Sequence, residues 1–373
     1  MNHLQLAAHR ALSLEASGIR KIFDLAATLK DPVNLSIGQP DFDVPDAVKM
    51  AAVEAMTRGF NRYTPSGGIP ELKNAVLARF KKTHGVQPED VLITSGVSGA
   101  LTLAMLALVN PGDEVLVPDP FFVSYKHLTT MCGGVPVFYD TYPNWSVDLD
   151  KLEKLVTPKT KMILAMSPGN PTGACLTDAA KKGLADLARR KNLALISDEI
   201  YEIFDYSGSV QKSLLTYYPE GTISVSGFSK TAAMTGWRVG WALGPKAWLE
   251  QMIKVQQFTF VCAPSFAQKA ALAAFEADLS AAVPQYKKKR DRMLAGLRSF
   301  GYEAETPGGA FYIFPKTPKK FPNATAFVEE AARRELLLVP GQVFSTRDTH
   351  FRISFAAPDE KLERGLEIFS KLI

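Results

Sequence analysis

The chain has 373 residues, 46% hydrophobic and 22% charged, which is ordinary for a globular protein long enough for two domains. Its formal net charge of +5 is spread without a focused basic stripe, which argues against nucleic-acid binding. The sequence has no run of about 18 apolar residues, no apolar N-terminal signal and only three widely spaced cysteines, so we expect a cytoplasmic protein without a membrane span, a disulfide framework or a cysteine metal site.

Strand-like and helix-like segments alternate through the central part of the chain. Short apolar runs bounded by turn residues predict buried strands at Val91–Thr94, Glu114–Pro118, Val135–Tyr139, Lys161–Ser167, Ala194–Asp198, Thr222–Ser226 and Arg238–Leu243. Helical patterns lie between them at Ser98–Val109, Asp178–Lys191 and Trp248–Phe260, and Thr177 is the expected N-cap of the second helix. This alternation predicts an α/β fold with a largely parallel sheet.

The pattern differs at the two ends of the chain. A helical stretch over Ser265–Ser299 is interrupted near Pro284, and it precedes expected strands at Gly309–Pro315, Leu336–Pro340 and His350–Phe355 and a closing helix at Lys361–Leu372. The N-terminal segment does not follow the alternation either. We therefore expect residues 1–40 to form an N-terminal arm and part of a small domain, residues 41–270 a large domain, and residues 271–373 a small C-terminal domain.

Two turns of small and polar residues follow predicted strands. In T-S-G-V-S-G-A-L at Thr94–Leu101, Ser98 and Gly99 stand where a helix begins, and backbone N–H groups at a helix start can bind an anion. In S-P-G-N-P-T-G at Ser167–Gly173, the following proline biases Asn170 toward an extended conformation. Its amide can then donate to an anionic oxygen, although the same residues are also an ordinary turn signal.

A carboxylate ends another predicted strand. In A-L-I-S-D-E-I-Y at Ala194–Tyr201, Asp198 closes the strand and Tyr201 follows three residues later. Open α/β sheets bind ligands at this edge, and a carboxylate there can pair with a protonated pyridine nitrogen. The alternative is that Asp198 only caps the chain segment that follows.

The segment Ser226–Gly240, S-G-F-S-K-T-A-A-M-T-G-W-R-V-G, places one lysine in a loop of small residues. A lysine held in a pocket can form a Schiff base with an aldehyde cofactor, and the nearby Ser229 and Arg238 can bind a phosphate. These features favour pyridoxal 5′-phosphate (PLP) as cofactor, whereas an ordinary surface role for Lys230 is the alternative.

Further motifs are Y-T-P-S-G-G at Tyr63–Gly68, D-P-F-F-V-S-Y at Asp119–Tyr125 and F-R-I-S-F-A at Phe351–Ala356. In their order and spacing, all these motifs together resemble the class I/II aminotransferases, which are fold-type I PLP enzymes. The resemblance extends from about Ser36 to Asp359. It implies a large PLP-binding domain with a mostly parallel central sheet flanked by helices, and a small α+β domain formed by both chain ends.

The resemblance also implies residue roles. The catalytic group comprises Lys230 as the Schiff-base lysine, Asp198 as the partner of the pyridine nitrogen, and Tyr201, which with Asn170 binds the ring hydroxyl oxygen. The remaining cofactor contacts are ring stacking by Phe122, a phosphate cup of Ser98, Gly99, Ser229 and Arg238, and Tyr63 reaching the phosphate of the neighbouring subunit. The substrate carboxylate is bound by Arg352, beside Asn170 and the loop residue Gly38.

Three positions depart from the common pattern of the family. Gly227 replaces a frequent serine, so one phosphate hydrogen bond is lost, and Phe122 replaces a frequent tryptophan or tyrosine but still offers a π face. The phosphate turn lacks the lysine of some aspartate-acting relatives, which disfavours an aspartate-specific enzyme.

The expected activity is reversible amino transfer from an L-amino acid to a 2-oxo acid by a ping-pong mechanism in a homodimer with active sites at its subunit interface. A carbon–sulfur β-lyase on the same scaffold is the alternative. A PLP-sensing regulator is disfavoured, because about 35 residues before the first motif are too few for a DNA-binding module. The substrate side chain is not predicted. Aromatic residues that can line its pocket are Phe23, Phe258, Phe260 and Tyr312, although packing in a helix core is the alternative for the two near residue 260.

Overall fold

The computed structural model describes residues 6–14, 29–208, 211–277, 279 and 281–373. Its centre is a seven-stranded sheet in the order β2-β8-β7-β6-β5-β3-β4. The strands are β2 (Asp90–Thr94), β3 (Glu114–Asp119), β4 (Val135–Asp140), β5 (Thr160–Met166), β6 (Ala194–Asp198), β7 (Thr222–Gly227) and β8 (Gly240–Gly244). Neighbouring strands run parallel, except that β8 is antiparallel to both β2 and β7. The expected α/β fold with a mostly parallel sheet is confirmed.

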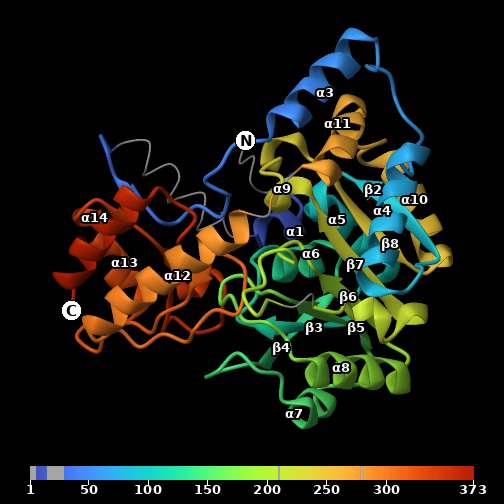
Figure 1. Ribbon diagram of the computed structural model, residues 1–373. Helices are drawn as coiled ribbons and strands as arrows, with labels where there is room; N and C mark the ends of the chain where they lie inside the picture. The colour runs from blue at the N-terminus through green and yellow to red at the C-terminus, as the bar shows by residue number, and fades with distance from the viewer. Residues whose placement is uncertain (1–5, 15–28, 209–210, 278, 280) are drawn as a thin grey trace.

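Helices cover both faces of this sheet because successive strand residues point to opposite sides. On β5, Met162 and Leu164 belong to the core under α5 (Gly96–Leu108) and α10 (Lys246–Phe258), whereas Ile163 and Ala165 belong to the core under α8 (Asp178–Lys191). Figure 1 shows these layers. The other helices of this part are α3 (Asp46–Thr57), α4 (Pro70–His84), α6 (Ser124–Met131), α7 (Leu149–Lys154), α9 (Phe228–Thr231) and α11 (Ser265–Glu276).

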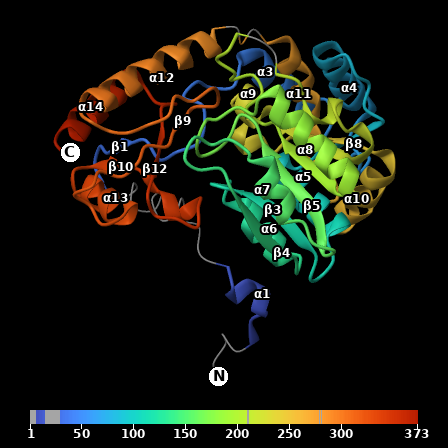
Figure 2. The same ribbon diagram turned by 90° about the horizontal axis from the view of Figure 1, so that it is seen from below.

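A smaller α+β region lies beside the sheet and joins segments from both halves of the chain. Strand β1 (Val33–Asn34) pairs in parallel with β10 (Leu336–Leu337). A second small sheet has the order β11-β12-β9. The strands of this second sheet are β9 (Tyr312–Ile313), β11 (Val339–Pro340) and β12 (Phe351–Ser354). The helices of the smaller region are α12 (Ala282–Ser299), α13 (Ala324–Arg333) and α14 (Asp359–Ser370). Figures 1 and 2 both show this region to one side of the central sheet, with α1 (His9–Leu12) near α6. The domain limits at residues 40 and 270 stay a prediction.

Four expected elements need correction. The strand expected at Leu336–Pro340 is divided into β10 and β11, which belong to two different sheets. The strand expected from Arg238 begins at Gly240, because Arg238 has a left-handed φ of 55° that cannot continue a strand. The helical break lies between Glu276 and Ala282, so Pro284 stands in the first turn of α12, where its missing N–H is not needed. The strand expected at Gly309–Pro315 contracts to Tyr312–Ile313.

Other expectations agree closely with the structure. Strand β6 and helix α8 have the predicted limits, and the Thr177 hydroxyl caps α8 by accepting from the N–H of Ala180 at 3.1 Å. Within the described ranges, no helix has the length and apolar character needed to cross a membrane.

Candidate active site

A pocket of about 300 Å³ opens at the carboxyl ends of the central strands, where they face the smaller region. It brings together most of the residues singled out from the sequence, which are Gly38, Ser98, Phe122, Asn170, Asp198, Tyr201, Ser229, Lys230, Arg238 and Arg352. The two others, Gly99 and Tyr63, line an open groove that shares Ser98 and Arg238 with the pocket. The ends of β2, β5, β6 and β7 therefore supply polar groups to one site, as expected for the ligand-binding edge of an open sheet.

Asp198 ends strand β6 and is only 2% exposed. Its carboxylate accepts from the hydroxyl of Tyr125 at 2.8 Å and from the N–H of Ile200 at 3.2 Å. Burial nevertheless raises the pKa of Asp198 to about 6, because the charged form is poorly solvated. A cation against this carboxylate would stabilise its charge. Tyr125 was missed from the sequence, although it ends the motif from which Phe122 was chosen.

Lys230 lies in α9, directly after strand β7, and is partly buried. Its Nζ donates to the backbone oxygen of Gly38 at 2.6 Å. Burial, together with the neighbouring cations Arg352 and Arg238, lowers the pKa of Lys230 to about 8. An amine with this pKa is partly neutral near neutral pH, so it can act as a nucleophile or as a base.

A guanidinium lies at the start of helix α5. Arg238 donates from Nη1 to the backbone oxygen of Thr235 at 2.8 Å and from Nη2 to that of Ser95 at 3.4 Å. Gly96 has a φ of 69°, and a Cβ there would lie 2.6 Å from Nη2 of Arg238, so this position requires glycine. The guanidinium, the helix N-terminus and the hydroxyls of Ser98 and Ser229 form a site suited to a phosphate.

Arg352 in strand β12 is 1% exposed and is the second guanidinium of the pocket. Its Nη1 donates to Oδ1 of Asn170 at 2.9 Å, and its Nη2 donates to the backbone oxygen of Ser36 at 2.6 Å. Its Nε finds no partner among the residues that the structure describes. A buried guanidinium with spare donor capacity can bind a carboxylate. Because Oδ1 of Asn170 is already used, its NH₂ group stays available to donate.

Tyr201 follows Asp198 by three residues and is fully buried. Its hydroxyl lies 2.7 Å from the hydroxyl of Tyr312, which also lines the pocket as one of the aromatic residues named from the sequence. Phe260 instead lines the open groove. Phe258 lines neither the pocket nor the groove and is 90% exposed, so both the pocket role and the alternative of helix-core packing are wrong for Phe258. Phe23 lies outside the described residues.

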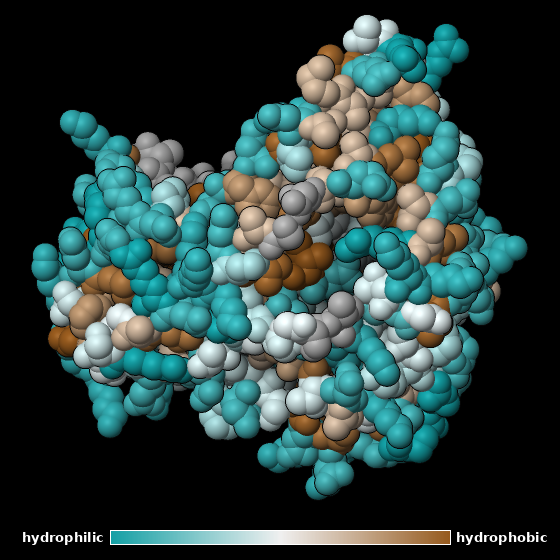
Figure 3. Space-filling model, in the orientation of Figure 1, coloured by the Kyte–Doolittle hydropathy of each residue, from teal (hydrophilic) through white to brown (hydrophobic). Residues whose placement is uncertain are grey.

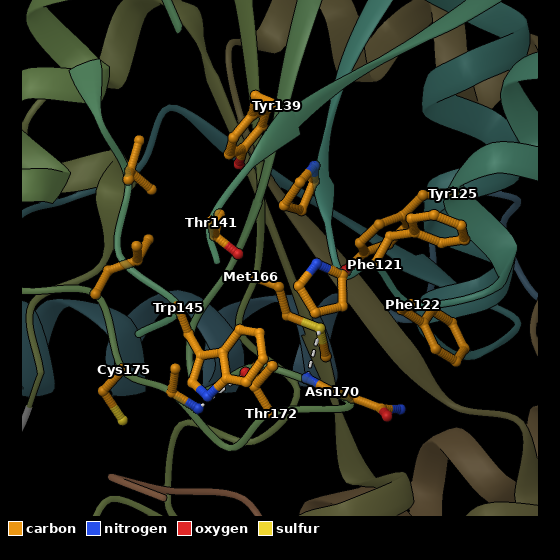
Figure 4. Close-up of a pocket in the computed structure, with 16 residues that line it drawn as sticks. Phe121, Phe122, Tyr125, Tyr139, Thr141, Trp145, Met166, Asn170, Thr172 and Cys175 are labelled. Atoms are coloured by element: carbon orange, nitrogen blue, oxygen red, sulfur yellow. Dashed lines mark hydrogen bonds between the residues drawn. The ribbon is translucent and has the colours of Figure 1, made fainter. Parts of the chain in front are cut away.

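The turn that carries Asn170 is held in place by close contacts. The sulfur of Met166 accepts from the backbone N–H of Asn170 at 3.4 Å, as the dashed line in Figure 4 marks. Gly173 has a φ of 69°, and a Cβ there would lie 2.8 Å from the backbone oxygen of Tyr312. Figure 4 also shows a second, smaller cavity of about 50 Å³, which shares Phe122, Met166 and Asn170 with the main pocket.

Gly227, the first of the departures from the family pattern predicted from the sequence, stands at a close approach of two strands. A Cβ at Gly227 would lie 2.8 Å from the Cα of Gly240 in the neighbouring strand β8. A serine there therefore requires the two strands to move apart.

Gly38 is equally crowded, and we expect Gly38→Ala to disturb the site. The new Cβ would lie 2.4 Å from the hydroxyl oxygen of Tyr312, a buried side chain that would have to shift away from its contact with Tyr201. Overpacking of this kind costs about 1–3 kcal/mol, so urea denaturation should show lower stability and kinetics a higher KM. The matched control is Gly236→Ala, because nothing lies within 4 Å of a Cβ there. Equal stability and KM in both variants would contradict this reading.

Comparisons with known proteins agree with the geometry. The family model described as aminotransferase class I and II matches residues 30–369. The aromatic-amino-acid aminotransferase 2 of Thermococcus litoralis is 37% identical over 96% of this chain and 95% of its own length. A probable aspartate/prephenate aminotransferase of Thermus aquaticus is 37% identical over 98% and 94%. The solved aspartate aminotransferase of Thermus thermophilus with maleate superposes with a TM-score of 0.95 at 35% identity, covering 98% of this chain and 99% of that one.

Proposed function

The chain belongs to the class I and II aminotransferases, and on this premise we propose that PLP is its cofactor and that the pocket around Lys230 is its active site. The observation that carries the proposal is the convergence of four charged side chains in one pocket. A lysine with a pKa lowered to about 8, a buried carboxylate and two guanidinium groups meet there, namely Lys230, Asp198, Arg238 and Arg352.

The residues present fit PLP at each of its polar ends. Arg238 and the start of α5, with the hydroxyls of Ser98 and Ser229, suit its phosphate dianion. The carboxylate of Asp198, which is costly to bury alone, suits the protonated ring nitrogen. For the ring hydroxyl oxygen we assign Tyr201 and the NH₂ group of Asn170 as donors, and we assign Phe122 as the residue that stacks on the ring.

When bound, PLP supplies an electron-accepting ring that makes the Cα proton of an amino acid removable. Lys230 tethers the cofactor and then carries the proton to and from the substrate Cα, for which a pKa of about 8 is well matched to neutral pH. Arg352 binds the substrate α-carboxylate with its spare donors and thereby orients Cα toward Lys230. Asp198 keeps a negative charge beside the ring nitrogen.

We propose a homodimer in which a second copy of the chain covers the open groove beside the phosphate site. Tyr63, which is 84% exposed, lines this groove together with Gly99 and Arg238. Apolar side chains gather over α3 and α11 in Figure 3, and Met50 of α3 is 65% exposed. Exposed apolar residues of this kind are typical of protein interfaces. In the dimer, Tyr63 of each copy reaches the phosphate bound by the other.

The test follows the cofactor's visible absorbance through one half-reaction. The purified protein should stay yellow after it is mixed with PLP and unbound PLP is removed. A panel of L-amino acids should then bleach the band with release of one 2-oxo acid per site, and an added 2-oxo acid should restore it. A protein that binds no PLP would contradict the proposal. Release of ammonia and pyruvate from cystathionine, independent of any oxo acid, would favour the carbon–sulfur lyase.

A further inference from the structure

Tyr312 contacts two parts of the pocket that have different proposed roles. It lies in the short strand β9, which pairs with the strand that carries Arg352, and its side chain is 0% exposed. Its hydroxyl oxygen is 2.7 Å from that of Tyr201, and its ring centroid is 4.6 Å from the Cζ of Arg352. One side chain therefore touches both the proposed cofactor site and the proposed carboxylate site.

We propose that Tyr312 is a positioning residue with two separable parts, a hydroxyl that directs the Tyr201 phenol toward the cofactor and a ring that holds the Arg352 guanidinium for the substrate carboxylate. This inference rests on the proposed function of the pocket. It assigns to Tyr312 a role in the amino-transfer reaction that acts through Tyr201 and Arg352.

The argument for the hydroxyl begins with its burial. A buried phenol is costly unless its hydroxyl has a partner, and the partner of Tyr312 is Tyr201. Each hydroxyl can donate one proton and also accept. If Tyr201 donates to the ring oxygen of the cofactor, Tyr312 is the donor to Tyr201. A hydroxyl that accepts a hydrogen bond is a stronger donor, so this pair stabilises an anionic oxygen better than Tyr201 does alone.

The hydroxyl of Tyr312 is also held in place by its surroundings. Gly38 approaches so closely that a Cβ on it would lie 2.4 Å from that oxygen. The backbone oxygen of Gly38 in turn accepts from Lys230 at 2.6 Å. The loop that carries Gly38 therefore packs against the hydroxyl, which keeps it directed at Tyr201.

The argument for the ring rests on the setting of Arg352. Its guanidinium lies between two aromatic rings, with Cζ 4.6 Å from the ring centroid of Tyr312 and 4.6 Å from that of Phe344. A buried cation gains from such ring faces, which replace part of its lost hydration. The two rings restrict the guanidinium plane, while the Nη hydrogen bonds to Asn170 and Ser36 fix its rotation. Its Nε, which has no partner in the described part of the chain, then has one defined direction.

A purely structural role is the alternative, because Tyr312 also belongs to the core of the smaller region, where its ring is 4.9 Å from that of Phe311. A core residue would tolerate Tyr312→Phe with no change in the chemistry of the bound cofactor. The two roles therefore predict different results for the loss of one oxygen atom.

The first test is a pH titration of the visible absorbance of the PLP-loaded protein without substrate. Tyr312→Phe keeps the ring and removes the hydroxyl, so the anionic form of the cofactor loses stabilisation. The midpoint of the absorbance titration should therefore rise by about 0.4–1 pH unit, which is the equivalent of one hydrogen bond. In a Tyr201→Phe background the same substitution should produce no further shift. A midpoint that is unchanged, or a shift that persists without the Tyr201 hydroxyl, would overturn the role of the Tyr312 hydroxyl.

The second test uses the amino acid that transaminates the wild-type protein. Tyr312→Met removes the ring and should raise KM by about 3- to 30-fold through the loss of one cation–π contact, whereas Tyr312→Phe should leave KM within about twofold of wild type. If Tyr312→Met fails to fold, Phe344→Met removes the opposite ring and should raise KM in the same way. Equal KM values in the ring-less and wild-type proteins would overturn the role of the ring.

The design separates this inference from the proposed function. If the wild-type protein binds no PLP, the proposed function fails. If the wild type shows the visible band and transaminates, but the Tyr312→Phe midpoint and the KM of the ring-less variant equal those of wild type, only the inference fails and Tyr312 is a core residue.

Discussion

Lys230→Ala is expected to abolish amino transfer, with kcat falling by at least about 10⁴-fold. The variant loses both the tether for the cofactor and the amine that moves the Cα proton, and no other lysine lines the pocket among the described residues. Stopped-flow measurement of the first half-reaction should therefore show no bleaching of bound PLP by the amino acid that reacts with wild type.

The matched control is Lys181→Met. Lys181 is buried, at 3% exposure, and burial lowers its pKa as it does that of the partly buried Lys230. Its Nζ donates instead to Gln211 and to the backbone oxygen of Lys212, outside the pocket. This variant should lose stability but retain the visible band and the half-reaction. If Lys230→Ala keeps a substantial half-reaction while Lys181→Met loses it, the assignment of Lys230 is wrong.

The lowered pKa of Lys230 also predicts how stability depends on pH. In the PLP-free folded protein this lysine loses its proton near its pKa of about 8, whereas in the unfolded chain it does so near 10.5. Between these values the unfolded state binds more protons, so the stability of wild type gains a contribution as pH rises through this window. Lys230→Met lacks this contribution, and urea denaturation across the window should show a shallower rise than in wild type. If the stability of wild type and that of Lys230→Met rise in parallel with pH, the lowered pKa of the Lys230 ammonium group is contradicted.

Local sequence patterns were sufficient to predict the elements of the central sheet. Strand β6 and helix α8 have the predicted limits because a short apolar run and a capped amphipathic helix carry their own boundary signals. The start of β8 was misplaced because nothing in the sequence marks the left-handed conformation of Arg238. The strand expected at Gly309–Pro315 was too long and the one expected at Leu336–Pro340 is divided between two sheets, since the pairing of these strands is set by residues that are not their neighbours in the chain.

Some residues of the candidate site could also be predicted from local sequence patterns, whereas others are brought together only by contacts between distant parts of the chain. Asp198 and Asn170 follow predicted strands directly, so the sequence could place them at one edge of the sheet. The contact of Tyr201 with Tyr312 joins residues 111 positions apart, and Arg352 meets Asn170 across 182 positions. Neither spacing carries a local signal. For Arg352 the family resemblance supplied the missing information, whereas Tyr312 was named only as an aromatic residue that can line the pocket.

Arg352→Ala is expected to lower kcat/KM by about 30- to 1,000-fold, mainly through KM. Removal of one partner of a buried, hydrogen-bonded charge pair costs about 2–4 kcal/mol, and here the group left without its partner is the substrate α-carboxylate. Arg352→Lys should recover little of this loss, because an ammonium keeps the charge but cannot reproduce the planar fork that reaches both the carboxylate and Asn170.

The comparison with Arg238→Ala distinguishes loss of substrate binding from general damage to the pocket. Both guanidinium groups line the same pocket, but Arg238 lies at the start of α5, where the phosphate is expected. Arg238→Ala should therefore weaken PLP binding in equilibrium dialysis, whereas Arg352→Ala should retain PLP and raise KM. Because Arg352 also bonds to Asn170 and Ser36, urea denaturation must accompany the kinetics. Arg352→Ala with wild-type KM and kcat/KM would show that another group binds the carboxylate, and the arrangement of Tyr312 around this guanidinium would then serve the fold alone.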